Sequence, residues 1–263
     1  MFSKRKVATL AAEFLGTGVL AFVVLTVSRS QIGIPYFVAS AAGLTVMLFA
    51  IAMQRDVNLN PALTIGLWTA RRISTIKAIG YIAAQLLGGL AAYSLFKYFS
   101  HGTVQELPTA YDGRILVAEA TGAFVFTLVA VSASYQQLHW LVRTVASGAG
   151  LTLGIWVASS ASAAFINPAV ALANNSWAWS TYVLGPVLGA IIGVNLYGLL
   201  FAPAGRGISF ARSIKPVSAK TASVSTVEDE DEDDEESEEK PAKTQKSASS
   251  NSSKKSSKKK SKK

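Results

Sequence analysis

The sequence contains no cysteine. Without thiols the chain can form no disulfide scaffold, no thiolate metal site and no thiol nucleophile. Charge is also scarce over the first 216 residues, which hold 14 basic and 5 acidic side chains, about 9% of the residues against about 25% in soluble domains. This composition excludes an ordinary soluble enzyme and a nucleic-acid-binding protein.

Long apolar stretches fill the space between the few charges. A helix of about 20 residues crosses a hydrocarbon core about 30 Å thick, and six stretches are long enough to do so. Four carry no charge, and the first and fourth carry one glutamate each, Glu13 and Glu119. We therefore expect an all-α membrane protein with six transmembrane helices, approximately Val7–Ser28, Tyr36–Met53, Ala78–Phe96, Ile115–Ser134, Thr144–Ile166 and Ser180–Ala204.

Lysine and arginine are unevenly distributed among the connecting segments. With a cytoplasmic N-terminus, the cytoplasmic segments before residue 217 hold eleven of these cations and the external segments hold three. This bias sets the orientation, and an even number of spans leaves both termini on the same side. We expect a multi-pass protein of the cell membrane, with an uncleaved first span and both termini in the cytoplasm.

Two further apolar pieces are too short to span. Asn60–Ala70 and Asn167–Ser176 are each about ten residues long, which as helix is about half a bilayer. Each begins with Asn-Pro, a good helix start, because asparagine caps the free N–H groups and proline suits the first helical position. The first piece runs into the cations Arg71 and Arg72, and the second ends at Asn174-Asn175, typical of a left-handed stop.

The sequence changes character at residue 217. Glu228–Glu239 holds eleven acidic residues in twelve positions, and the remainder of 217–263 is rich in lysine and serine. Such a segment buries too little apolar surface to fold, so we expect a disordered cytoplasmic tail. A solvated tail is the favoured interpretation; contact with anionic lipid or a partner, or phosphorylation, is the alternative.

The two halves of residues 1–216, the expected transmembrane domain, share a pattern. The two glutamates lie 106 residues apart, and the two Asn-Pro-Ala triplets lie 107 residues apart. Each half therefore holds three spans, with a half-helix between the second and the third. Because three is odd, the second copy enters from the opposite face, which predicts an inverted repeat over about 7–99 and 114–204.

Further motifs accompany the two triplets: Ala12–Thr17, Ala84–Gly88 and Gly185-Pro186. With these motifs, residues 7–204 resemble the aquaporin family, the major intrinsic proteins. The resemblance implies a right-handed bundle of six helices with two re-entrant half-helices, one narrow pore in each subunit and a homotetramer, so that residues 1–216 form an aquaporin-like channel domain. It also implies a pore centred on the two triplets, Asn60, Pro61, Ala62 and Asn167, Pro168, Ala169.

Paired half-helices of this kind can select solutes by charge. Two helix N-termini that meet at the midplane present free N–H groups and about half a positive charge each. The amides of Asn60 and Asn167 add donors, so water or a hydroxyl is accepted while cations meet an unfavourable potential. We expect downhill permeation of water or small uncharged solutes such as glycerol, with no chemistry, no cofactor and no bound metal.

The two intramembrane glutamates have two interpretations. Glu13 and Glu119 could form part of a proton relay, because intramembrane carboxylates are often functional. They could instead be structural acceptors for backbone N–H groups of the re-entrant loops. Their pairing across the repeat and the family resemblance favour the structural role.

The outer constriction departs from the family pattern. In water-selective members it contains an aromatic, a histidine, a small residue and an arginine that follows the second triplet. The corresponding positions in this chain are Ala42, Ile155 or Val157, Ala164 and Val170. Without the arginine, we expect a wider and more apolar ring that passes larger neutral solutes or closes by dewetting. Arg55, five residues before Asn60, is a candidate for a substitute positive charge.

Two other functions stay open at this point. A secondary transporter also uses inverted repeats and broken helices, and only Glu13 and Glu119 could supply its ion site at the midplane. A non-conducting membrane protein that acts through its tail is the other. An enzyme is not expected, because the spans contain no nucleophile–base pair and no metal cluster.

Overall fold

The structure is a computed structural model that describes residues 4–30, 34–53, 57–102, 104, 110–176 and 178–203. Within these residues all regular structure is helical. The tail expected at 217–263 lies outside the described residues, as does Arg55. The helices are α1 (Lys4–Ser28), α2 (Pro35–Met53), α3 (Pro61–Thr69), α4 (Thr75–Ser100), α5 (Gly113–Tyr135), α6 (Trp140–Ala158), α7 (Pro168–Ala173), α8 (Trp179–Tyr182) and α9 (Leu184–Leu200).

Six helical segments are long and apolar enough to cross a membrane, which confirms the predicted number of spans. They are α1, α2, α4, α5, α6 and the continuous stretch Trp179–Leu200 formed by α8 and α9. Many large apolar side chains point outward, such as Leu48, which is 62% exposed, whereas the buried positions are rich in alanine and glycine. This distribution suits a protein surrounded by lipid, where small residues let helices approach.

Glycines bring several spanning helices into backbone contact. Gly122 in α5 and Gly154 in α6 face each other, and a Cβ added to either would lie 2.5 Å from the carbonyl oxygen of the other. Gly18 in α1 and Gly88 in α4 form a similar contact. These approaches leave no room for a side chain, so they fix which faces of the helices turn inward.

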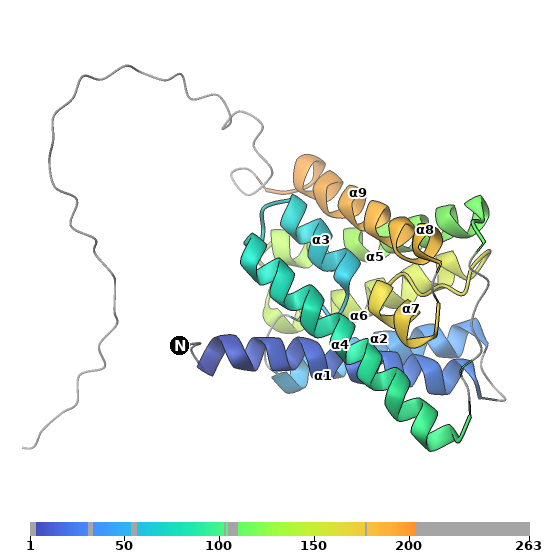
Figure 1. Ribbon diagram of the computed structural model, residues 1–263. Helices are drawn as coiled ribbons and strands as arrows, with labels where there is room; N and C mark the ends of the chain where they lie inside the picture. The colour runs from blue at the N-terminus through green and yellow to red at the C-terminus, as the bar shows by residue number, and fades with distance from the viewer. Residues whose placement is uncertain are drawn as a thin grey trace, which may run out of the picture. The chain divides into compact units, whose positions relative to one another are not determined.

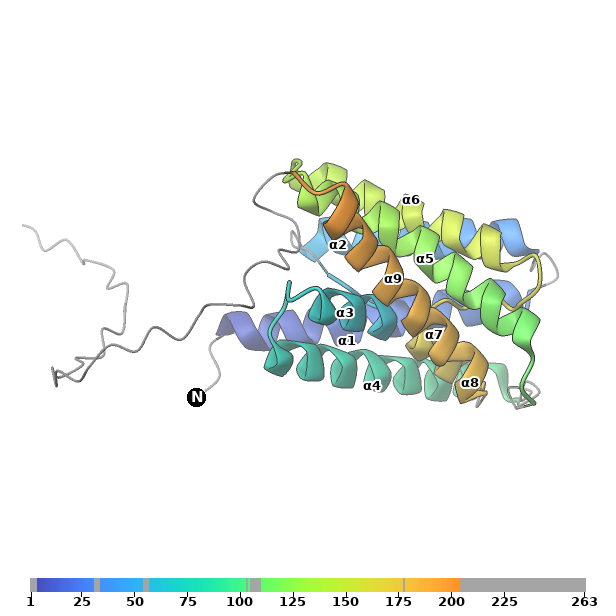
Figure 2. The same ribbon diagram turned by 90° about the horizontal axis from the view of Figure 1, so that it is seen from above.

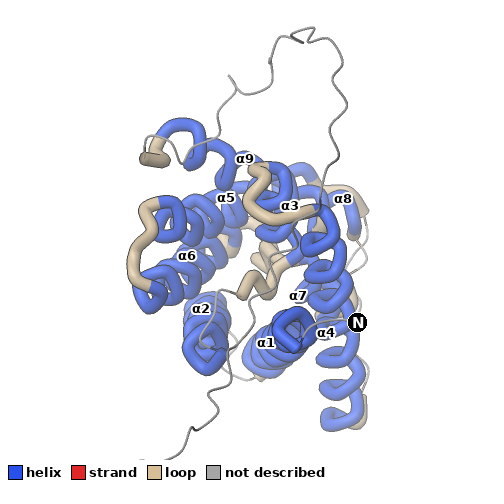
Figure 3. The backbone as a smooth tube through the Cα atoms, turned by 90° about the vertical axis from the view of Figure 1, so that its left-hand side faces the viewer, coloured by secondary structure: helices blue, strands red, loops and turns tan. Residues whose placement is uncertain are grey.

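The described bundle has two ends, which we name by their residues. The N-terminal face carries Lys4, Tyr135, Trp140 and Leu200, and the far face carries Ser28, Ser100, Gly113 and Ala158. The short helices α3 and α7 follow one another along the middle of the bundle, between the long helices (Figure 2). Seen from the N-terminal face, the loops that lead into them lie inside the ring of long helices (Figure 3).

The half-helices begin as predicted but are unequal in length. The first matches the prediction, since α3 has Asn60 as its N-cap and Ala70 as its C-cap. The second is shorter than predicted: α7 contains six residues, Asn174 caps it, and Asn175 follows with a left-handed φ of 58°. Both helices pack against α4, and α3 also packs against α9 (Figure 1).

Several span ends differ from the prediction: the third span is Thr75–Ser100 instead of Ala78–Phe96, and the last span ends at Leu200 instead of Ala204. The fifth span differs most. The predicted helix Thr144–Ile166 is instead α6, Trp140–Ala158. Residues after Ser160 are apolar enough to continue it, but they turn back toward the middle of the bundle, with Ala164 at φ 54° and Ile166 at φ 41°. The fourth helical element, α4, is longer than its apolar run, because Ser74 caps it ahead of polar Thr75.

Candidate channel pore

Each half-helix starts at an asparagine whose side chain satisfies a backbone donor. Asn60 Oδ1 accepts from the N–H of Ala62 at 2.8 Å, and Asn167 Oδ1 accepts from the N–H of Ala169 at 3.0 Å. Pro61 and Pro168 occupy the first helical positions. The triplets therefore form local helix starts, because the asparagine caps one free N–H and the proline presents none.

The same two asparagines also join the half-helices to each other. Asn60 Nδ2 donates to the carbonyl of Ile166 at 2.9 Å, and Asn167 Nδ2 donates to the carbonyl of Leu59 at 2.8 Å. The tips of α3 and α7 are thus held together by two reciprocal hydrogen bonds between buried groups. A primary amide has two N–H donors, so each asparagine keeps one for a third partner.

The residues that supply those carbonyls adopt an unusual backbone. Leu59 has φ 53° and Ile166 has φ 41°, and both are fully buried. A left-handed conformation is costly for a side chain with a Cβ, and most costly for a β-branched one such as isoleucine. Such strain persists only where neighbouring groups hold it in place.

Two buried glutamates hold these strained loop residues in place. Glu13 in α1 accepts from the backbone N–H of Asn58 at 2.8 Å and of Leu59 at 2.9 Å. Glu119 in α5 accepts from the N–H of Phe165 at 3.0 Å and of Ile166 at 2.6 Å. Each glutamate thus accepts hydrogen bonds from the loop directly before one triplet.

A polar network around Glu13 was not anticipated. Gln85 in α4 donates to Glu13 Oε2 at 2.7 Å and to the hydroxyl of Thr64 at 3.0 Å. Thr64 in turn donates to the carbonyl of Asn60 at 3.0 Å. The corresponding partner of Glu119 is Ser162, whose hydroxyl lies 2.7 Å from Oε1. A lone glutamine in the middle of an apolar span was the sequence signal for this network.

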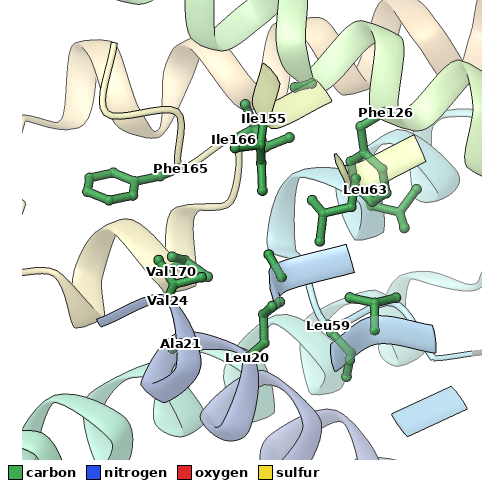
Figure 4. Packing of buried hydrophobic residues seen from close by; sticks show 14 of the residues in the cluster. Leu20, Ala21, Val24, Leu59, Leu63, Phe126, Ile155, Phe165, Ile166 and Val170 are labelled. Atoms are coloured by element: carbon green, nitrogen blue, oxygen red, sulfur yellow. The ribbon is translucent and has the colours of Figure 1, made fainter. Parts of the chain in front are cut away.

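A narrow apolar cavity lies between the triplets and the far face. It contains about 10 Å³, room for about one water molecule. Leu20 and Val24 of α1 lie across from Ile155 and Phe165 in it (Figure 4). These α1 residues and Phe165 narrow the cavity, and its lining side chains are apolar apart from Asn167. That the ring is wider than in water-selective members stays a prediction. Its lining is Leu20, Val24, Val38, Ala42, Leu151, Ile155, Ala163, Ala164, Phe165, Asn167 and Val170.

The two candidates on α6 lie in different places. Ile155 is buried and lines the cavity together with Ala42, Ala164 and Val170. Val157 is 38% exposed and lies on the outer surface of the bundle beside α5, so it does not belong to the ring.

A wider cavity opens from the triplets toward the N-terminal face. This vestibule has a volume of about 250 Å³ and joins apolar walls to hydroxyl, amide and guanidinium groups. Arg72 is placed by an aromatic ring, since its guanidinium carbon lies 3.9 Å from the centre of the Tyr135 ring. The polar lining consists of Asn58, Arg72, Tyr81, Ser134, Arg143, Thr144 and Ser147.

The family profile described as "Major intrinsic protein" matches residues 2–197, three quarters of the chain. The chain belongs to the major intrinsic protein family. This confirms the resemblance read from the triplets and the paired glutamates.

Individual proteins agree with the family assignment. The chain is 31% identical to aquaporin Z of Photorhabdus laumondii over 225 residues, which cover 73% of this chain and 97% of that protein. It is 32% identical to aquaporin PIP2-5 of Oryza sativa subsp. japonica over 190 residues, 64% of this chain and 67% of that one. The aquaglyceroporin structure from Plasmodium falciparum shares the fold, with TM-score 0.61, 22% identity and coverage of 73% and 95%.

Proposed function

We propose that this chain conducts water passively along a path that runs from the vestibule, between the tips of α3 and α7, through the apolar constriction to the far face. Membership of the major intrinsic protein family makes the chain a membrane channel for water and small solutes rather than an enzyme. The observation that carries the proposed path is the pair of reciprocal bonds between Asn60, Asn167 and the carbonyls of Ile166 and Leu59.

The triplets supply the selective chemistry at the middle of the path. Each asparagine keeps one N–H donor after its cap and cross-link are made, and the two helix N-termini add positive potential. A water oxygen can accept from both amides in turn, whereas a cation is repelled. Glu13 and Glu119 act as structural acceptors that hold the loops, so the route needs no proton relay.

The size of the constriction favours water over larger solutes. Its volume matches about one water molecule, and a three-carbon polyol such as glycerol needs Leu20, Ile155 or Phe165 to move aside. Glycerol is the second candidate solute, because the ring formed by Ala42, Ile155, Ala164 and Val170 is apolar and carries no fixed charge. The name of the Plasmodium relative, an aquaglyceroporin, is compatible with either solute.

The proposal includes the membrane orientation of the chain and its assembly with other copies. Among the described residues the N-terminal face carries the larger share of cations, which supports a cytoplasmic N-terminus and C-terminus in a cell membrane. The exposed apolar helix faces are suited to lipid and to neighbouring copies in a homotetramer. The cations of the N-terminal face are Lys4, Arg5, Lys6, Arg71, Arg72, Lys77 and Arg143, and those of the far face are Arg29, Lys97 and Arg114.

Stopped-flow light scattering on proteoliposomes tests the proposal. Vesicles with the protein should shrink faster than empty vesicles in an impermeant osmolyte, and should re-swell slowly in glycerol and urea. Equal rates with and without protein would refute the channel. Uptake that depends on a cation and is lost in Glu119→Gln would instead favour the transporter, and a chain truncated after residue 216 should keep its water permeability.

A further inference from the structure

The two cavities along the path differ in charge. The lining of the far-face constriction contains no charged side chain among the described residues, and its only polar side chain is that of Asn167. The vestibule has two cations, Arg72 and Arg143, and no carboxylate in its described lining. Positive side chains are therefore concentrated on the side of the triplets that faces the N-terminal end of the bundle.

The positions of these arginines are set by separate elements. Arg72 follows the end of α3; its backbone N–H donates to the carbonyl of Leu67 at 2.8 Å, and its guanidinium group stacks on the buried ring of Tyr135. Arg143 lies in the first turn of α6, next to buried Thr144, and is half-buried. Stacking on an aromatic face orients a guanidinium group, so the charge of Arg72 is held in place.

The walls strengthen the effect of this charge. Val46, Leu63 and Val131 line the same vestibule, and a charged mouth with low-dielectric walls concentrates the potential along the path. A unit charge roughly 8 Å away, at an effective dielectric constant of about 20 and with physiological screening, depletes a monovalent cation about fourfold, and two such charges together deplete it about tenfold. Two such charges act on any cation that approaches the triplets from this face.

The positive potential of the vestibule matters most for the exclusion of protons. A metal cation or an anion must shed water to enter a constriction of about 10 Å³ that offers it no charged partner. A proton can move along a file of water molecules and avoids that cost. The apolar constriction alone therefore does not exclude protons from a channel that conducts water.

We propose that Arg72 and Arg143 form a second proton-excluding charge filter of this channel, which adds to the positive potential at the triplets and is located in the vestibule of the N-terminal face rather than in the far-face constriction. The proposal rests on the proposed water channel. The two residues act on permeating charge through their electrostatic potential, so charge at each position is what matters, more than the shape of the side chain.

The experiment measures proton flux and water flux on the same proteoliposomes, with a trapped pH-sensitive dye and stopped-flow light scattering. In the double variant Arg72→Met/Arg143→Met, proton flux should rise about tenfold or more while water permeability stays near the wild-type value. The double variant Arg72→Lys/Arg143→Lys keeps both charges and should retain low proton flux. Lys97→Met, at the exposed far-face end of α4, is the matched control and should change neither flux.

The outcomes separate the two proposals. Normal water permeability with unchanged proton flux in the methionine variant overturns the charge filter and leaves the channel intact. Raised proton flux in the lysine variant also overturns it, because the defect is then one of packing. Absence of water permeability in the wild type overturns the channel itself. If the methionine variant does not fold, proton flux through the wild type is measured at low and at high ionic strength. Raising the ionic strength from 0.01 to 1 M shortens the screening length from about 30 to about 3 Å and so weakens the potential of the two arginines. Proton flux should then increase, and constant flux overturns the filter.

Discussion

The side-chain amide of Asn167 donates a 2.8 Å hydrogen bond to the carbonyl of Leu59, 108 residues earlier in the chain. The mirror bond joins Asn60 to Ile166. Each asparagine therefore has two tasks: its oxygen caps its own half-helix, and its nitrogen fixes the other one. This relationship explains why both triplets begin with the same residue, since serine or aspartate would cap equally well but could not donate in the same way.

Asn167→Asp separates the two tasks. The carboxylate keeps the cap on the N–H of Ala169 but loses the donor, so the carbonyl of Leu59 is left without its partner. Thermal unfolding in detergent should show a loss of about 1–3 kcal/mol, and water permeability should fall. Asn195→Asp is the control, because the Asn195 amide bonds Thr69 at an exposed site. Equal effects of the two substitutions would show that the cross-link does not support the pore.

Glu119→Gln should weaken the approach to the second triplet. The glutamate accepts from the N–H groups of both Phe165 and Ile166, whereas a glutamine has one acceptor oxygen and presents an N–H group to the second donor. We expect a loss of about 1–3 kcal/mol in the free energy of unfolding, measured by denaturant titration. Ser162→Ala removes a single hydroxyl partner and should cost less. A variant as stable as the wild type would contradict the structural role of this carboxylate.

Gly189→Ala should prevent the normal packing of α9 on α5. The added Cβ would overlap the backbone carbonyl of Ala120, its carbonyl carbon included at 2.8 Å, and a backbone group of a packed helix cannot move aside. Folded yield and thermal stability should drop sharply. At Gly80 the nearest atom is the flexible Cδ2 of Leu10 at 3.2 Å, so Gly80→Ala should be tolerated or slightly stabilising. Tolerance of both substitutions would refute the close approach.

Ile155→Ala should widen the constriction. The substitution removes three carbons from a side chain that lines a cavity of about 10 Å³, which gives a three-carbon polyol room to pass. Glycerol flux should therefore rise while water flux persists. Val157→Ala changes a residue of the same type two positions away on the outer surface and should leave both fluxes unchanged. The ratio of glycerol to water permeability in proteoliposomes checks this. A larger change at Val157 than at Ile155 would place the path elsewhere.

The sequence was most informative where a local rule applied. The six apolar runs predicted the spans, and the Asn-Pro pairs predicted both half-helix starts; each of these depends on neighbouring residues alone. The repeat was predicted because the spacing of the two glutamates, 106 residues, nearly equals that of the two triplets, 107 residues. The end of α6 could not be predicted, because apolar residues up to Ile166 suit a helix. The turned backbone is favoured by groups on other elements: Glu119 accepts from the N–H groups of Phe165 and Ile166, and Asn60 donates to the carbonyl of Ile166.

The dimensions of the pore could not be predicted from the sequence for a similar reason. The width of the constriction depends on Leu20 and Val24, which belong to the first span and carry no motif. The choice between Ile155 and Val157 depends on how α6 is rotated, and the contact of Gly154 with Gly122 fixes that rotation. The position of Arg72 over Tyr135 likewise joins residues 63 positions apart.

The absence of cysteine permits the most direct test of the path between the half-helices. Single cysteines are placed at Leu63 in the vestibule and at Val170 in the constriction, with Val157→Cys as the outward-facing control. A small thiol reagent is then added during stopped-flow measurement of water permeability. The reagent should block water flow at both Leu63→Cys and Val170→Cys and should have no effect at Val157→Cys. Complete labelling of Leu63→Cys and Val170→Cys without loss of water flow would show that water does not pass between the half-helices.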